Sequence, residues 1–240
     1  MARVSQLPES PRLDARYVEQ TVRRLEERIR ARFPDRNLGN AARELGRMVP
    51  EIQAGFRESK ERRSHVRLIS RGASLVIVVL TLIALVIALR DAVTTGLDHS
   101  FTWVTLIESL VNDVIFAAIA VVFLWLLPER LERRALLDLL HKLRSQAHVV
   151  DMHQLDKDPE QARADYTPTA KSPAHRMNAE DLHHYFDYCS ELVSLIAKTA
   201  ALCAERTSDP VVLVTVSEIE TLAAQLSQKI WQKISLLPEH

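Results

Sequence analysis

The sequence has few of the residues on which disulfide-linked folds and phosphate-binding loops depend. Only 2 cysteines and 5 glycines occur among its 240 residues. Cys189 and Cys203 lie fourteen residues apart on one segment of helical periodicity, and this separation excludes a disulfide between them within a straight helix. We therefore expect both to be small, buried core residues in a reducing compartment.

Motifs that carry catalysis are also missing. The sequence has no Gly-x-Ser-x-Gly elbow, no Gly-rich phosphate loop with its lysine, no His-Glu-x-x-His and no Cys-x-x-Cys. An overall charge of one sign is absent too, since Lys+Arg and Asp+Glu both number 31. We predict that the chain is not an enzyme and holds no resident cofactor.

The most informative feature that is present is a pair of long apolar segments. Residues 72–89 read GASLVIVVLTLIALVIAL, eighteen residues without a charge, and as a helix they would cover roughly 27 Å, close to the thickness of a bilayer's hydrocarbon core. The second segment contains VIFAAIAVVFLWLL, and Trp103 and Trp125 lie near its two ends, where indole rings favour the membrane interface. We predict membrane spans at about 72–90 and 103–127.

The distribution of lysine and arginine predicts the orientation of these spans. Residues 57–71 carry six basic residues and residues 129–144 carry five, whereas the connection between the spans holds Arg90 alone. The positive-inside rule then predicts a transmembrane helical hairpin with both termini in the cytoplasm. Residues 1–71 offer no apolar segment, so the first span is expected to serve as its own insertion signal. Without organelle-targeting signals, this pattern favours a bacterial inner membrane.

Basic charge gathers next to the predicted bilayer. Residues 1–71 hold 17 basic and 10 acidic residues, whereas residues 129–240 hold 13 and 17. The basic segments Arg57–Arg71 and Arg130–Arg144 suit anionic lipid head groups, each charge contributing about 1 kcal/mol near the surface. We therefore predict the lipid bilayer as a partner and do not expect nucleic-acid binding.

The N-terminal region, residues 1–71, has the periodicity of cytoplasmic helices. A helix over residues 13–33 is predicted to stop at Pro34, a second begins near Leu38, and Pro50 is expected to open a third. The first helix has a narrow apolar stripe typical of packing on a partner helix, made of Val18, Val22, Leu25 and Ile29.

The C-terminal part, after the transmembrane hairpin (72–128), is predicted to contain three regions. Residues 129–150 continue the second span as a juxtamembrane helix, residues 151–177 form a proline-punctuated linker, and residues 178–240 form an antiparallel helical hairpin. Asn178 and Asp209 are the expected N-caps of its two helices. The predicted fold is therefore all-α, and its amphipathic stripes favour a homo-oligomer or a helical protein partner.

Asp113 is the most informative polar residue, because it lies about 22 Å along the helix from Pro128 and therefore within the hydrocarbon. An intramembrane charge costs roughly 2.5 to 3.5 kcal/mol, so its side chain should face protein or water. Two faces of small or polar residues are candidates for helix contact: Ser109, Asp113, Ala117 and Ala120 on the second span, and Ser74, Thr81, Ala84 and Ala88 on the first.

Two interpretations of this acidic face stay open. In the first, Glu108 and Asp113 form rings of carboxylates along a cation pathway in an oligomer. In the second, Glu108 pairs with Arg90 near the outer surface, and a protonated Asp113 forms a hydrogen bond with Thr81 or Asn112 at a helix contact.

Histidines provide a further candidate site, because six of the 9 lie between residues 141 and 184. Imidazole and carboxylate ligands suit zinc, iron or manganese. The candidate ligands are His148, Asp151, His153, His183, His184 and Asp187. The alternative is that these histidines are solvated or cap helices, with His183 and Asp187 a surface pair one helical turn apart.

These observations predict an oligomeric interaction or scaffold protein that anchors a cytoplasmic helical module to a membrane. A small oligomeric cation channel that uses Asp113 and Glu108 is the first alternative. A membrane-tethered metalloenzyme built on the histidines is the second.

Overall fold

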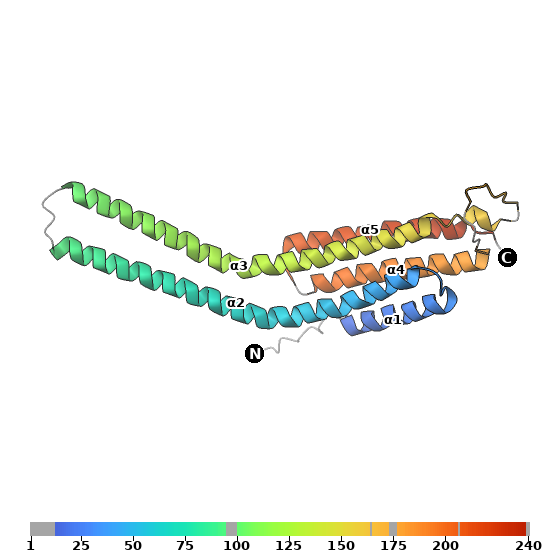
Figure 1. Ribbon diagram of the computed structural model, residues 1–240, viewed down its shortest axis with the longest axis horizontal. Helices are drawn as coiled ribbons and strands as arrows, with labels where there is room; N and C mark the ends of the chain where they lie inside the picture. Colours follow the sequence, from blue (N-terminus) through green and yellow to red (C-terminus); the bar gives the residue numbers. More distant parts are fainter. Residues whose placement is uncertain (1–12, 95–99, 164, 173–176, 206, 239–240) are drawn as a thin grey trace, which may run out of the picture. The chain divides into compact units, whose positions relative to one another are not determined.

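The structure, a computed structural model, describes residues 13–94, 100–163, 165–172, 177–205 and 207–238 (Figure 1). Within these ranges all regular structure is helical and no strand is present, which confirms the predicted all-α class. The elements are α1 (Ala15–Arg32), α2 (Leu38–Thr94), α3 (Ser100–Leu155), the short 3-10 helix η1 (Pro159–Ala162), α4 (Ala179–Ala204) and α5 (Pro210–Ser235). The side chains of residues 57–67 and of Trp103, on which two predictions depend, lie outside the described residues.

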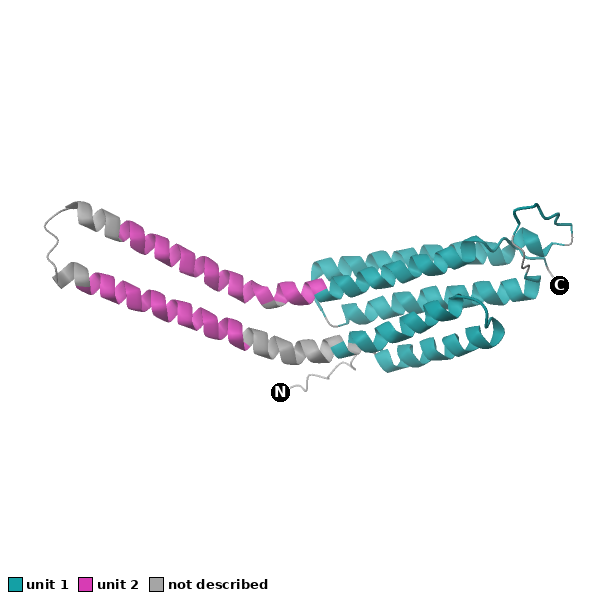
Figure 2. Cartoon of the chain, viewed as in Figure 1, with its two compact units in different colours: residues 1–56, 135–240 teal, residues 57–134 magenta. Residues whose placement is uncertain are grey.

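The chain divides into two compact units. Unit 1 consists of residues 1–56 and 135–240, and unit 2 of residues 57–134 (Figure 2). Helices α2 and α3 each contribute to both units. Unit 1 contains the hydrophobic core, which α1, the first turns of α2, the last turns of α3, and α4 and α5 build together.

Helix α1 begins where the sequence supplies an N-cap. The Asp14 carboxylate accepts a hydrogen bond from the Arg16 backbone N–H at 2.9 Å, which satisfies one of the free donors of the first turn. The predicted apolar stripe is confirmed as the buried face of this helix: Val18, Val22, Leu25 and Ile29 are all at most 2% exposed.

The two C-terminal helices begin at the predicted caps. Asn178 Oδ1 accepts from the Asp181 N–H at 2.7 Å, and Asp209 Oδ1 accepts from the Val211 N–H at 2.9 Å. Pro210 occupies the first turn of α5, where its missing N–H has no helical partner to lose. The valine-rich start of α5 is helical as predicted, and α4 and α5 run antiparallel (Figure 1).

Ion pairs show how α1 lies on α4. Arg28 contacts Glu191 at 2.8 Å, and Arg32 contacts Glu180 at 2.8 Å, so the sequence number rises on one helix as it falls on the other. The two helices are therefore antiparallel. At the C-terminal end of α1, the Phe33 ring packs edge-on against the Tyr185 ring of α4, and the two ring centres are 5.5 Å apart.

The last turns of α3 run parallel to α5. Arg144 contacts Glu218 at 3.4 Å, and farther along both helices Lys229 contacts Asp151 at 3.0 Å. Because the residue numbers rise together along the two helices, the N-terminal end of α5 lies beside the first turns of α3 that belong to unit 1.

Two predicted boundaries are wrong. Pro50 does not open a helix, because α2 runs through it from Leu38. The proline ring is exposed while Val49 and Ile52 on either side are buried, so core packing outweighs the lost hydrogen bond. The predicted linker also starts too early. Helix α3 continues to Leu155 because Val150 and Gln154 are fully buried in the core.

Unit 2 contains two helical segments that are long and apolar enough to cross a membrane. They are Leu68–Arg90 and a segment that begins at Ile107. Most of their large apolar side chains are exposed, in contrast to those of unit 1. Near one end, the Ser70 hydroxyl donates a hydrogen bond to the Leu124 carbonyl and so joins α2 to α3.

The caps of unit 1 lead to a stability prediction. Replacing Asp209 by Ala removes the acceptor of two first-turn N–H groups and should lower the free energy of unfolding of unit 1 by about 1 kcal/mol, up to about 2. Thermal unfolding of the full chain in detergent, followed by circular dichroism, measures this loss. The neighbouring exposed Ser208→Ala is the control, and equal midpoints for the two variants would contradict the assigned cap.

Candidate functional site

The predicted intramembrane acids lie on an exposed side of the second apolar segment. Glu108, Ser109, Asn112 and Asp113 are all exposed. Neither Glu108 nor Asp113 forms a hydrogen bond or ion pair with the part of the chain that the structure describes. The predicted contact of Asp113 with Thr81 is therefore not formed within one chain.

The polar side chains of the first apolar segment are less exposed, and those of Ser74 and Thr81 form hydrogen bonds within their own helix. Ser70 and Ser74 are only 5% and 6% exposed, and Ser74 donates to the Ser70 carbonyl at 2.8 Å. Thr81 is half-buried and donates to Ile77 at 2.9 Å within its own helix. Ala84, predicted on this face, is exposed instead.

The apolar pattern does not single out Ser70, because this residue precedes the uncharged run that begins at Gly72. Its four-residue spacing from Ser74 was the available signal. On α3, Ala117 and Ala120 are half-buried as the predicted face requires, but Ser109 and Asp113 of that face are exposed. The predicted face is therefore less exposed at Ala117 and Ala120 than at Ser109 and Asp113.

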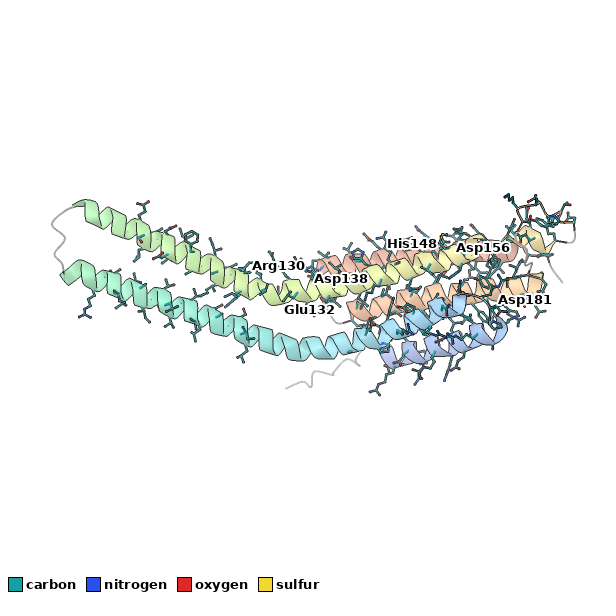
Figure 3. The ribbon with its side chains drawn as sticks, in the orientation of Figure 1. Arg130, Glu132, Asp138, His148, Asp156 and Asp181 are labelled. Atoms are coloured by element: carbon teal, nitrogen blue, oxygen red, sulfur yellow. The ribbon has the colours of Figure 1, made fainter. Side chains whose placement is uncertain are left out.

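The six candidate metal ligands do not come together. Among the described residues no group of three or more histidine, cysteine or acidic side chains has metal-binding geometry. Asp151 instead accepts hydrogen bonds from Lys229 at 3.0 Å and Gln154 at 2.6 Å. His184 lies 3.7 Å from Glu180 on its own helix, and exposed His148 lies on α3 (Figure 3).

A partly buried polar network that no sequence pattern predicts lies at the C-terminal end of α3. Lys233 Nζ donates to the backbone carbonyls of Gln154 at 2.6 Å and Lys157 at 3.1 Å. The Gln154 carbonyl also accepts from the Lys157 backbone N–H at 3.2 Å, and a cation at this position complements the negative end of the helix dipole. The same ammonium lies 5.4 Å from the centre of the Phe186 ring. The network fastens α5 to the end of α3.

Burial changes the acid–base properties of this region. Desolvation lowers the pKa of Lys233, and the neighbouring Lys229 lowers it further. Burial raises the pKa of Cys203 to about 12, and it raises the pKa of Cys189 as well. Both cysteines are free and buried, as predicted. Their thiols are therefore protonated and shielded, which makes them unreactive in the folded protein.

No protein family model, curated protein or solved structure matches this chain. The function must therefore be argued from the apolar segments of unit 2 and the helical module of unit 1.

His153 leads to a pH-dependent prediction. Burial lowers the pKa of this histidine below its ordinary value of 6.5, Asp156 opposes the shift, and Lys157 adds to it. The unfolded chain therefore takes up the proton first, and stability present above about pH 6.5 is lost as the pH falls below it. The unfolding midpoint of the full chain should drop between about pH 7.5 and 5.5, and His153→Gln should reduce the drop. The exposed His148→Gln is the control. An unchanged pH profile for His153→Gln contradicts the assignment.

Proposed function

We propose that this chain is a two-pass integral membrane protein in which a transmembrane hairpin anchors a helical interaction module. The observation that supports it is the contrast between the two units. In the two apolar segments 22 leucine, isoleucine, valine, phenylalanine and tryptophan side chains are 42–71% exposed. In unit 1 the same residue types make a closed core in which many side chains are fully buried.

The magnitude of this exposure favours a bilayer over water. Covering one such side chain is worth about 1.5–3 kcal/mol, so even half of the lower value for each of 22 residues is roughly 16 kcal/mol. That exceeds the whole stability of an ordinary domain, about 5–15 kcal/mol. The bilayer supplies the missing apolar surroundings without any rearrangement of the helices.

The proposed orientation follows from the basic residues that flank the spans. Arg71 on one side of the hairpin and Arg130, Arg133 and Arg134 on the other favour one compartment, the cytoplasm, for both ends of the chain. A bacterial inner membrane suits this arrangement, and anionic head groups would receive these side chains. The ion-pair-rich helical module then lies in the cytoplasm and acts through contacts with protein, as a scaffold that assembles into an oligomer.

Accessibility of introduced cysteines tests this proposal. Asp98→Cys places a thiol between the spans, and Gln225→Cys places one on the exposed side of α5. In intact bacteria that produce the full chain, a membrane-impermeant maleimide should label Asp98→Cys, and it should label Gln225→Cys only after the inner membrane is opened.

The unmodified chain is the control, because its native thiols are buried and should stay unlabelled. Labelling of Gln225→Cys in intact cells would overturn the orientation. Release of the chain from membranes by an alkaline carbonate wash would overturn membrane insertion itself.

A cation channel is the second candidate function. The observation that favours it is the exposure of Asp113, whose carboxylate has no partner in the described part of the chain and therefore requires another subunit or water. In that arrangement Glu108, Ser109 and Asn112 would line the outer part of the pathway.

Planar-bilayer recordings of the purified chain test this function. The unmodified chain should conduct cations, and Asp113→Asn should reduce the single-channel conductance because it removes the charge that attracts them. Glu129→Gln, an exposed acid beyond the apolar segment, should leave the conductance unchanged. Absence of currents, or equal currents from Asp113→Asn, excludes the carboxylate pathway.

A further inference from the structure

The outer side of the α4–α5 pair carries small side chains where exposed helices ordinarily carry charge. At 100° per residue these positions fall within about 80° of one another on each helix. All are exposed or half-buried, so no other described helix covers them. The surface, here named the α4–α5 face, includes Ser190, Ser194 and Ala197 of α4 and Ser217, Ala224 and Ser227 of α5.

Two large apolar residues mark the ends of this face. Leu213 and Trp231 are eighteen residues apart, which is five full helical turns, so they project from the same side of α5. Leu213 is 39% exposed and Trp231 is 60% exposed. An exposed tryptophan beside small residues is the composition of a binding surface, since tryptophan is enriched among residues that dominate interface energies.

The charges on the α4–α5 face complement one another. Lys198 of α4 and Glu220 of α5 are both exposed on it, and neither forms an ion pair with a described residue. Lys198 Nζ instead donates to the Ser194 hydroxyl at 2.8 Å. A partner that presents one acid and one base at matching positions would satisfy both groups, and the same face of a second copy has this pattern.

We propose that the α4–α5 face binds the α4–α5 face of a second copy of this chain, about a two-fold axis parallel to the helices. The inference rests on the proposed function and deepens it, because the proposed scaffold acts by assembling into an oligomer. Since α4 and α5 are antiparallel, this axis places α4 of one copy against α5 of the other.

The alignment of α4 with α5 within one chain predicts which residues meet across the two-fold axis. Lys233 of α5 lies over the Phe186 ring of α4, so residues whose numbers sum to about 419 are at the same height. Lys198 is then level with Glu220, and Ser194 is level with Ala224. Across the two-fold axis, each Lys198 meets Glu220 of the second copy. The small side chains allow the two faces to approach closely. Trp231 is level with Asp187 of the second copy, whose carboxylate can accept a hydrogen bond from the indole N–H.

Charge reversal tests this interface in the full chain, reconstituted in nanodiscs and measured by mass photometry. Lys198→Glu and Glu220→Lys should each weaken the dimer about tenfold, because each substitution creates two pairs of like charges across the two-fold axis. The double variant should restore dimerisation. Trp231→Ala should weaken it by about thirtyfold. Gln225→Ala, on a different side of α5, should have no effect.

Cross-linking tests the geometry independently. Two differently tagged chains, one with Ser194→Cys and one with Ala224→Cys, are produced together and oxidised in the membrane. Because each chain has one introduced thiol and its native cysteines are buried, a mixed disulfide must join two copies. Replacing Ser194→Cys by His148→Cys, on the exposed side of α3, should abolish it.

The outcomes separate this inference from the proposal on which it rests. A monomer in nanodiscs overturns it, and so does a dimer that shows neither the mixed disulfide nor rescue by the double charge reversal. Capture of a different helical protein by the face of a monomeric chain overturns it as well. In each of these cases, retention in carbonate-washed membranes leaves membrane insertion standing, whereas release from the membrane overturns the proposed function itself.

Discussion

The apolar surface of residues 68–90 and 107–126 is the constraint on which the rest of the structure depends. Neither α2 nor α3 covers this surface, because most of the large apolar side chains of both segments are exposed. Backbone polar groups within these helices are satisfied internally, which is what a segment in hydrocarbon requires. Uninterrupted helix is therefore the local structure that this surface demands, and α2 and α3 remain helical through Pro50 and beyond the apolar segments.

Unit 1 differs in this respect, because its apolar side chains are buried in a core of its own. Its five helical segments bury their stripes against one another, and polar groups close the ends: Asp14, Asn178 and Asp209 satisfy N-terminal N–H groups, while Lys233 satisfies carbonyls at the end of α3. This last contact requires a partly desolvated ammonium, whose cost is offset by two carbonyl acceptors and the Phe186 ring. The network also explains why α3 extends past the point at which its apolar periodicity ends.

The sequence predicted those features that depend on neighbours along the chain. The stripe of α1, the caps of α4 and α5, and the burial of both cysteines follow from local periodicity and from the chemistry of single residues. Features that depend on distant residues were missed. Nothing near Gln154 indicates that Lys233, 79 residues later, will cap its helix. The histidines likewise gather in the sequence, but among the described residues no group of three or more histidine, cysteine or acidic side chains has metal-binding geometry.

The geometry of the α4–α5 face also bears on the choice between a scaffold and a channel. A two-fold contact uses the same patch on both copies and is complete when two chains have met, so by itself it produces a dimer and no larger ring. A dimer brings only two copies of Asp113 into one assembly, and a conducting ring of carboxylates needs more helices to surround water. A channel would therefore require a second, different interface on unit 2, and the exposed side of α3 that carries Ser109 and Asp113 is the surface available for it. The scaffold needs only the one interface, and the proposed contact through the α4–α5 face of unit 1 therefore favours it.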